Sequence, residues 1–586
     1  MDLHFQGPEA SAEERAAVDG VLRDQPAHRD LLLPALHAAQ DRFGWVTPGA
    51  LDYICRRLSV PPAEAHGVVT FYHLLSLEPM PAAMTHVCDD IACRVQGAER
   101  LCDELARRLG PEGEGGWKRS PCLGLCERAP AAVVIRAGAA PSAFAVAPAS
   151  AEAIATEPEE DFTAFRRSVP REGGRLLHRI GRVDPSSLSG YLESGGYAGL
   201  RRAIEIGPAA VIGEVSASKL MGRGGAAFPT GRKWEAVARA SARPHYVICN
   251  ADESEPGTFK DRVLMEGDPF AVVEGMTIAG LATGSERGFL YIRGEYPLAL
   301  RRMAAAIESA RAGGWLGRDL QGSGLSFDIE IRRGAGAYIC GEETALFNSI
   351  EGKRGEPRNK PPFPSEAGVF GKPTLVNNVE TLVNIPLILR LGGEAYAKIG
   401  TSASTGPKLF CVSGHVERPG VYEVDFGATL GELIAMAGGV TGGRRLRAVL
   451  LGGAAGVFVG PDQLAMPLTF EGTRAAAATL GSGVILAFDD STDLGDILLR
   501  IAAFFRDESC GQCVPCRVGT VRQAELLHRL RSGCLIGDLA TELALLREIG
   551  QVMRDASICG LGQTASSAVE SALTALELLA GPEPRS

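Results

Sequence analysis

Apolar and polar positions along the chain follow strand-like and helix-like periods in turn, and these periods predict its elements. Alternation in THVC and in AAVVI predicts two strands, and the helical period of GAERLCDELARRLG between them predicts an amphipathic helix. HYVICN and the segment from Ile329 predict further strands, each followed by a turn. After about Lys408 short strands alternate with one helix, and TELALLREIGQVMRDA returns to the helical period. The pattern therefore predicts α/β units followed by a helical end.

The size of the chain predicts several modules. Its 586 residues exceed what one hydrophobic core usually organises, so we expect roughly three to five of them. Hydrophobic residues make up 45% and charged residues 22% of the sequence, close to the averages for soluble globular proteins, which excludes a largely disordered chain. Residues 152–161 and 400–407 are rich in small or acidic side chains and predict boundaries between modules.

Charge and hydropathy narrow the class of partner. The net charge is -10 and the pI about 5.7, so no broad attraction to nucleic acid or to an anionic membrane is expected. No run of about 18 apolar residues lacks a charge or a proline, and the N-terminus has no secretion signal. We therefore expect a cytoplasmic protein that contacts neither nucleic acid nor a membrane.

The 14 cysteines favour metal binding over disulfides, because a reducing cytosol keeps thiols free. Eight of them form two sets of four. The first set, with spacings CxxxxC and CxxxC, comprises Cys88, Cys93, Cys122 and Cys126. A 2Fe-2S cluster needs four thiolates delivered from loops, and the predicted strand–helix–strand unit supplies such loops. Zinc is the alternative, although zinc sites favour CxxC knuckles and often include histidine.

The second set comprises Cys510, Cys513 and Cys516 in ESCGQCVPCRVG and Cys559 in SICGLG. A CxxCxxC triplet can wrap three corners of a 4Fe-4S cluster, and a remote cysteine closes the site. Zinc is again the alternative, but no histidine accompanies the triplet, and its spacing is too tight for two knuckles. The scattered cysteines are interpreted as buried small apolar side chains; they are Cys55, Cys102, Cys249, Cys340, Cys411 and Cys534.

A glycine-rich stretch, LMGRGGAAFPTGRKW, occupies residues 220–234. Gly222, Gly224 and Gly225 permit close backbone approach, so amide N–H groups can converge on a phosphate, and Arg223 and Lys233 add positive charge. The spacing does not match the Rossmann GxGxxG pattern, and an ordinary turn is the alternative interpretation.

Three further loops carry polar groups suited to a nucleotide. NADESEPGTFK follows the predicted strand HYVICN with a dense cluster of acids, at the place where open α/β sheets bind ligands. GAGAYICGEE places two acids at the start of a helix, while KPPFP and then VNNVET offer a cation, an aromatic ring and two amides. Each loop alone also fits a capped turn.

The four loops, followed by CxxCxxC and a remote cysteine, resemble the NADH-oxidising flavoprotein subunit of respiratory complex I over about residues 199–570. Residues 8–150 resemble the small 2Fe-2S subunit of that complex. The resemblance implies a fusion that binds FMN, NAD(H), one 2Fe-2S cluster and one 4Fe-4S cluster. The implied fold is multidomain α/β plus α, with these domains: an N-terminal helical bundle (8–80), a thioredoxin-like 2Fe-2S domain (81–150), a linker (151–200), a Rossmann-like FMN/NAD domain (201–400), a ubiquitin-like β-grasp module (401–490) and a helical bundle with the 4Fe-4S cluster (491–586).

The resemblance also implies roles for single residues. It makes both cysteine sets cluster ligands and places Glu342, Glu343, Lys360 and Phe363 against NADH, with the phenyl ring on adenine. The implied FMN contacts and remaining cofactor-binding residues are Gly222, Arg223, Gly224, Gly225, Lys233, Asn250, Asp252, Glu255, Asn377, Asn378, Thr381, Tyr338 and Gly341. No catalytic side chain is implied, because FMN itself exchanges the hydride. One departure is Ala227, where the family usually has glycine, and its methyl group is expected to narrow the approach to the cofactor.

At least two families carry such a fusion: the β subunits of NAD-dependent formate dehydrogenase and the diaphorase subunits of NAD-reducing nickel-iron hydrogenases. The setting of Cys559 in MRDASICGLGQTAS and the intact first cysteine set favour the formate dehydrogenase version. The expected partner is therefore a molybdenum- or tungsten-containing α subunit, whose electrons pass through 4Fe-4S to FMN and reversibly to NAD+. The alternatives are the hydrogenase diaphorase and a flavin-free electron-transfer scaffold or redox sensor, for which Ala227 is the hint.

Overall fold

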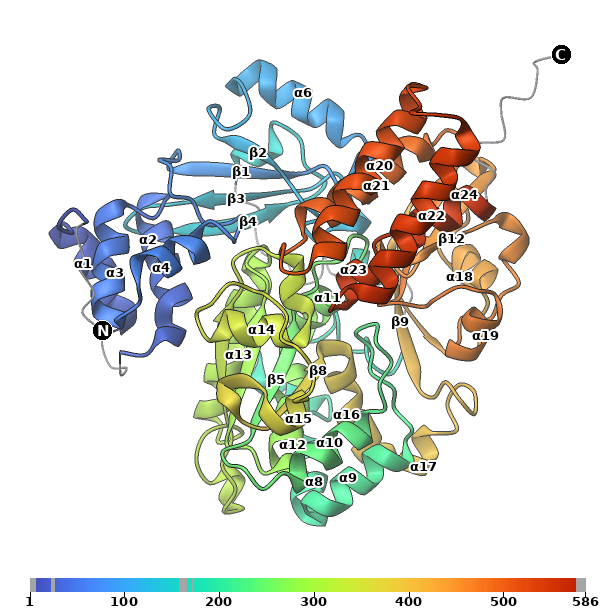
Figure 1. The fold of residues 1–586 in the computed structure, drawn as a ribbon. Coiled ribbons are helices and arrows are strands. Elements are labelled where there is room, and N and C mark those ends of the chain that lie inside the picture. Colours follow the sequence, from blue (N-terminus) through green and yellow to red (C-terminus); the bar gives the residue numbers. More distant parts are fainter. Residues whose placement is uncertain (1–6, 23–26, 157–165, 171–172, 576–586) are drawn as a thin grey trace.

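The structure, a computed structural model, describes residues 7–22, 27–156, 166–170 and 173–575. Parts of the predicted linker (157–165 and 171–172) and the end of the last predicted domain (576–586) lie outside these ranges. Figure 1 shows an N-terminal helical bundle, two α/β domains, a β-rich module and a C-terminal group of helices. Within the described ranges, no helix combines the length and apolar character needed to cross a bilayer.

The N-terminal bundle consists of α1 (Ala12–Leu22), α2 (Leu32–Phe43), α3 (Pro48–Leu58) and α4 (Pro62–Val69). α3 begins at a favourable cap, because the Thr47 hydroxyl accepts the Ala50 N–H at 3.1 Å and Pro48 needs no donor there. The bundle is tied to the central α/β domain by Arg332, which donates to the Asp30 carboxylate at 2.8 Å.

The next domain has a four-stranded sheet in the order β2-β1-β3-β4. β1 (Ala83–Cys88) runs parallel to β2 (Trp117–Ser120) and antiparallel to β3 (Ala132–Arg136), which pairs with β4 (Ser142–Val146). α5 (Ile91–Val95) and α6 (Ala98–Leu109) connect β1 to β2, and α6 buries its apolar side. The predicted strand–helix–strand unit is therefore confirmed, with the first cysteine pair at the end of β1 and on α5.

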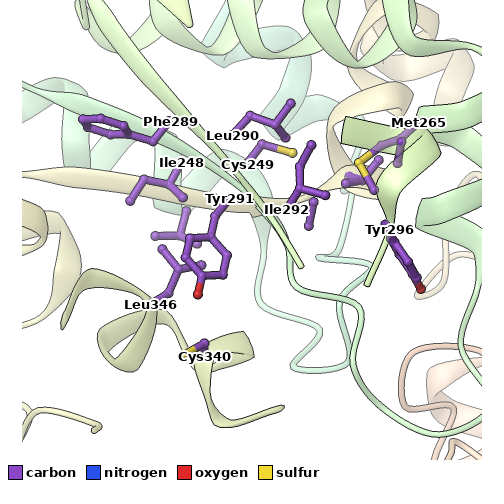
Figure 2. Close-up of a cluster of buried hydrophobic side chains, with 14 of the residues drawn as sticks. Ile248, Cys249, Met265, Phe289, Leu290, Tyr291, Ile292, Tyr296, Cys340 and Leu346 are labelled. Carbon is purple, nitrogen blue, oxygen red and sulfur yellow. The ribbon is translucent and has the colours of Figure 1, made fainter. Parts of the chain in front are cut away.

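The central domain has a parallel sheet in the order β7-β6-β5-β8, with β5 (Tyr246–Ala251), β6 (Arg287–Ile292), β7 (Asp328–Arg333) and β8 (Thr374–Asn378). Both faces of β6 are buried: Figure 2 shows Phe289 and Tyr291 on one side of the strand, and Leu290 and Ile292 on the other. Its helices are α7 (Leu188–Glu193), α8 (Ala198–Ile206), α9 (Pro208–Ala217), α10 (Thr230–Arg239), α11 (Lys260–Gly267), α12 (Pro269–Thr283), α13 (Pro297–Ala312), α14 (Glu343–Ile350), α15 (Pro364–Ala367), α16 (Val379–Leu391) and α17 (Gly393–Tyr396).

The β-rich module has a five-stranded sheet in the order β10-β9-β13-β11-β12. Its elements are β9 (Pro407–Gly414), β10 (Gly420–Asp425), α18 (Leu430–Met436), β11 (Leu446–Leu451), β12 (Val457–Val459), α19 (Phe470–Ala475) and β13 (Val484–Asp489). The sequence predicted one helix here, and α19 is a second, short one capped by Thr469. The module encloses a core of its own.

The C-terminal helices are α20 (Leu494–Asp507), α21 (Val514–Ser532), α22 (Leu539–Ala556), α23 (Gly560–Thr564) and α24 (Ser567–Ala575). α21 and α22 pack against each other, and α22 contains the stretch TELALLREIGQVMRDA that the sequence predicted to be helical. α20 contacts α5 of the thioredoxin-like domain, and α24 packs against β12. The C-terminal helices thus touch both the N-terminal half of the chain and the β-rich module.

A buried ionic cluster joins the central domain to the β-rich module. The Glu380 carboxylate accepts the ammonium groups of Lys408 at 2.8 Å and Lys260 at 3.0 Å, and it also accepts the Leu409 N–H at 3.0 Å. All three charged side chains are almost completely buried. Burial raises the pKa of Glu380, but Lys408, Lys260 and Arg223 outweigh that effect and hold the pKa below its usual value. Glu380 is therefore an anion that neutralises cations which have no access to water.

Replacing Glu380 by glutamine tests this cluster. The substitution leaves Lys260 and Lys408 buried without their shared anion, so we expect a loss of roughly 3–5 kcal/mol in the free energy of unfolding. Differential scanning calorimetry measures the effect. The control is Glu525→Gln, which removes an exposed partner of Arg522 and is expected to cost less than about 1 kcal/mol. Equal midpoints for the two variants would contradict the assignment.

Candidate cofactor and electron-transfer site

A cavity of about 710 Å³ opens beside the carboxyl ends of β5 and β8. This volume lies in the range of small-molecule sites. Most of the predicted cofactor residues line it, from all four loops. The lining residues among them are Gly222, Gly224, Lys233, Asn250, Gly341, Glu342, Glu343, Lys360, Phe363, Asn377, Asn378 and Thr381. The loops that the sequence suggested separately therefore converge on one cavity.

The glycine-rich loop packs tightly against β8. A Cβ atom on Gly224 would lie 3.0 Å from the Asn378 Cβ, closer than side chains normally approach, and Gly225 adopts a φ of +106°. The Arg223 N–H donates to the Thr381 hydroxyl at 2.8 Å, which fixes the loop to the start of α16. Glycine at these positions lets the backbone form one wall of the cavity.

The Arg223 side chain does not face the cavity. Its guanidinium donates to the backbone carbonyls of Thr405 at 2.7 Å and Pro407 at 3.1 Å, and it lies over the Phe426 ring. The prediction that Arg223 supplies charge to a bound phosphate is therefore wrong for the side chain. The guanidinium instead anchors the loop to the start of β9, while the cationic groups that line the cavity include Lys233 and Lys360.

The NADESEP loop contains two acids with predicted flavin contacts, and the first, Asp252, lies near the edge of the cavity. The Asp252 carboxylate accepts the Ser254 hydroxyl at 2.8 Å, but its second oxygen is buried without a partner, and burial raises the pKa of Asp252 to about 8. This oxygen lies 3.6 Å from where a Gly341 Cβ would stand, and Gly341 lines the cavity. An unsatisfied polar atom at that edge suits a polar ligand such as a flavin.

Glu255 is turned toward the β-rich module. Its carboxylate accepts the Ala455 N–H at 2.9 Å, and burial raises its pKa to about 7. It does not line the cavity, so its flavin contact stays a prediction. The sequence showed only a cluster of acids at a strand end, and such a cluster does not indicate which carboxylate points into the cavity.

The far side of the cavity combines acids, cations and an aromatic ring. Lys360 donates to Glu342 at 2.9 Å and to Glu343 at 3.0 Å, and Lys233 lies 3.3 Å from Glu343. Burial raises the pKa of Glu343, but Lys233 and Lys360 outweigh burial and leave that pKa below its usual value. Phe363 is 53% exposed, so one face of its ring is free to stack on a base.

Amide side chains hold the strand ends in place. The Asn250 amide donates to the Gly341 carbonyl at 2.8 Å, which joins the acidic loop to the GAGAYICGEE loop. The Asn377 side-chain oxygen accepts the Trp234 indole N–H at 2.9 Å. Asn378 caps α16 by accepting the Glu380 N–H at 2.9 Å. These three asparagines therefore shape the cavity as well as line it.

Ala227 has a left-handed backbone conformation with φ of +50° and lines the cavity. That conformation costs a non-glycine residue about 1–2 kcal/mol, which explains why glycine would be favoured at this position. Phe228 follows it, lines the same cavity and is 49% exposed. Phe228 was not predicted as a cofactor residue, although its position inside the glycine-rich motif was an available signal.

The first cysteine set converges in a buried site. Cys88, Cys93, Cys122 and Cys126 are each at most 4% exposed, and the Cys122 and Cys126 sulfurs lie 3.4 Å apart. The Cys88 thiol lies within hydrogen-bonding reach of Cys93 and Cys122. Four thiols without a histidine or carboxylate among them are the donor set that a 2Fe-2S cluster uses.

Two further contacts order this cysteine loop. The Gly124 N–H donates to the Cys122 sulfur at 3.4 Å, and Asp90 accepts the Cys122 N–H at 3.2 Å. Gly124 has a φ of +64°, and a Cβ there would overlap the Tyr296 hydroxyl. Only glycine fits between this loop and the central domain.

The second cysteine set lies where α20, α21 and α23 meet. Cys516 is in the first turn of α21, Cys559 is the N-cap of α23, and a Cβ on Gly562 would lie 2.8 Å from the Cys516 Cβ. Cys510 and Cys513 are half-buried. The set again contains only thiols, which fits a 4Fe-4S cluster.

The cavity adjoins this second set. Gly560, next to Cys559, lines the cavity wall. Tyr338 lies nearby: its N–H donates to Glu508 at 2.8 Å, its ring is 5.0 Å from Phe504, and its pKa is raised by burial. Tyr338 does not line the cavity, so its cofactor role stays a prediction.

The remaining cysteines are buried as predicted, with one correction. Cys534 is exposed, because it lies in the turn between α21 and α22.

Among the described residues, no group of three or more His, Cys, Asp or Glu side chains surrounds a single metal-ion position.

Comparison with known families matches each part of the chain. Residues 215–387 match the family described as Nuo51 FMN-binding domain, and residues 18–142 match the thioredoxin-like 2Fe-2S ferredoxin. Residues 409–456 match the SLBB domain, and residues 496–577 match the NADH-ubiquinone oxidoreductase-F iron-sulfur binding region. These matches confirm the predicted fold class and the predicted cofactors.

Relatives extend over most or all of the chain. It is 44% identical over 400 residues to the F 2 component of the NADH-quinone oxidoreductase of Rhizobium meliloti, covering 68% of this chain and 94% of that protein. It is 36% identical over 583 residues to the NAD-reducing hydrogenase HoxS subunit alpha of Cupriavidus necator, covering 95% and 92%. A chain in the crystal structure of an air-oxidized NAD+-reducing NiFe-hydrogenase has a TM-score of 0.79 at 32% identity, covering 96% and 95%.

The chain therefore belongs to the family of NADH-dependent flavoprotein subunits that includes this NADH-quinone oxidoreductase component and the HoxS alpha subunit, and it uses FMN, NAD(H), one 2Fe-2S cluster and one 4Fe-4S cluster.

Proposed function

We propose that this chain is the diaphorase subunit of a cytoplasmic NAD-dependent formate dehydrogenase, whose molybdenum- or tungsten-containing partner subunit oxidises formate. The second cysteine set would hold the 4Fe-4S cluster, which would supply single-electron exchange with the partner, and the nucleotide cavity would hold FMN, which would supply reversible hydride transfer to NAD+. One observation supports the diaphorase part of this proposal: Gly560, which is next to the cluster ligand Cys559, also lines the nucleotide cavity.

The chemistry needs little from the protein besides placement. Bound FMN exchanges two electrons with nicotinamide and single electrons with iron–sulfur clusters. The glycine-rich loop presents backbone amides, and Lys233 supplies a cation beside them. Lys360 holds Glu342 and Glu343 in one orientation, so that ribose hydroxyls meet fixed acceptors. No side chain is assigned as acid or base.

The second cysteine set is also placed to meet another protein. Cys510 and Cys513 are only half-buried. Apolar side chains exposed around the set include Val514 at 59% and Ile558 at 38%. A cluster near the surface, bordered by apolar side chains, suits electron exchange with a partner subunit.

Two features support formate dehydrogenase as the partner: the ICGLGQ setting of Cys559 and the intact first cysteine set. A nickel-iron hydrogenase is the second candidate, because the HoxS alpha subunit is 36% identical over 95% of this chain. Neither formate nor hydrogen is expected in the nucleotide cavity, since either would react on the partner.

Metal analysis of the native complex distinguishes these partners. The chain is isolated under anaerobic conditions from its natural host through an affinity tag, and the co-purifying subunits are analysed for metals. Molybdenum or tungsten, with formate-dependent NAD+ reduction, is the expected result. Nickel with hydrogen-dependent NAD+ reduction would establish the hydrogenase assignment and overturn ours.

The flavin loop is tested by Gly224→Glu. A side chain at this position collides with Asn378 and occupies the cavity. We expect loss of FMN and, because FMN carries the hydride chemistry, loss of nearly all NADH-ferricyanide activity, while the iron content is kept. The control is Gly213→Glu, because Gly213 is exposed on α9 and faces open space. Full FMN content in the first variant would disprove the loop assignment.

Asp252 predicts a pH-dependent stability of the flavin-free chain. Its pKa is raised from 3.8 to about 8 by burial, so the folded chain keeps a proton that the unfolded chain loses between these values. Stability from this group therefore falls as the pH rises across that window. In Asp252→Asn the loss is absent, so its thermal midpoint should exceed that of the wild type by a margin that grows up to about pH 8. The exposed Asp462→Asn serves as control; a pH-independent margin would contradict the assignment.

A further inference from the structure

Beyond the nucleotide cavity, a buried arginine joins the first cysteine loop to the acidic flavin loop. Arg293 follows β6 and is 2% exposed. One amino group of its guanidinium donates to the Cys122 carbonyl at 2.6 Å, and the other donates to the Glu253 carbonyl at 2.7 Å. Glu253 lies inside NADESEP, next to Asp252. One planar side chain thus bonds the backbones of two loops from different domains.

Neighbouring side chains support this contact from the same domain. Glu295 pairs with the guanidinium at 3.1 Å. The Tyr296 hydroxyl donates toward Glu253, lying 3.1 Å from its carboxylate, while its ring lies under Arg293. Arg262, on α11, donates to the Gly124 carbonyl at 2.7 Å. The cysteine loop is therefore held at two nearby carbonyls by two buried arginines.

Fixing these carbonyls also fixes the opposite ends of their peptide groups. A trans peptide is planar, so a carbonyl bonded to Arg293 turns the next N–H, that of Leu123, in the opposite direction. The same holds for the Gly124 carbonyl and Arg262. The Gly124 N–H already donates to the Cys122 sulfur. Hydrogen bonds to cluster sulfurs and nearby positive charge are two of the factors that set an iron–sulfur reduction potential.

We propose that Arg293 is a positioning residue for the 2Fe-2S site: it fixes the Cys122 loop against the flavin loop and raises the reduction potential of that cluster. The reduced cluster carries one more negative charge, so the guanidinium that donates to the Cys122 carbonyl at 2.6 Å favours it. The proposal depends on the 2Fe-2S cofactor and not on which partner subunit the chain serves.

The test is a redox titration followed by electron paramagnetic resonance, which separates the signals of the two clusters. Arg293→Met removes the charge and both hydrogen bonds and leaves Glu295 unpaired, so the 2Fe-2S midpoint potential should fall, while that of 4Fe-4S stays. Arg293→Lys keeps the charge but cannot bond both carbonyls in a planar fork, so an intermediate shift is expected. Total iron and FMN are measured in parallel.

Arg332 provides a matched control. It is 5% exposed, lies on the neighbouring strand β7 and bonds Asp30 of the N-terminal bundle, away from the cysteine loop. Arg332→Met and Arg332→Lys should destabilise the chain without moving the 2Fe-2S potential. If Arg293→Met does not retain iron, the 2Fe-2S potentials of Arg293→Lys and Arg332→Lys are compared instead and test the proposal. An unchanged 2Fe-2S potential in Arg293→Lys, or an equal shift in Arg332→Lys, overturns the proposal.

Discussion

The structure depends on pairing charges that have been removed from water at the junctions between its domains. An isolated charge in a protein interior is costly, and a partner offsets that cost only at close range and in good geometry. Glu380 meets Lys260 and Lys408 between the central domain and the β-rich module, and Arg262 of the central domain meets Glu127 beside the first cysteine set. Each junction is therefore fixed in position, because sliding by a few ångströms would separate the charges.

This constraint places the redox sites relative to one another. The nucleotide cavity takes its walls from loops at the ends of β5 and β8. α20 leads from contacts with the thioredoxin-like domain, through Arg94 and Asp496, to the second cysteine set. Tunnelling between cofactors is sensitive to distance, so domains that are locked by buried ion pairs suit this function better than domains joined by loose contacts.

The sequence predicted those parts of the fold and site whose signals are local. Cysteine spacing, the glycine-rich loop and strand-like alternation each lie within a short stretch, so both cysteine sets and the cavity loops were found. The bonds of Arg293 were not, because its partner Cys122 is 171 positions away and no periodicity marks such a pair. Arg223 was misassigned for a related reason: the motif specifies the backbone path, whereas the direction of the side chain depends on the β-rich module. The segment expected as a linker likewise contains α7 and a buried Arg179–Asp268 pair, which only tertiary packing reveals.

The carbonyl contacts of Arg262 and Arg293 also affect how the two halves of the molecule come together. They join parts of one polypeptide, so forming them costs no translational entropy of association and does not depend on protein concentration. Had the two halves been separate subunits, the same few bonds would have needed a large interface to keep them together in dilute solution. Covalent fusion thus fixes a one-to-one ratio of the two halves, and the directional bonds of the two arginines help to align them.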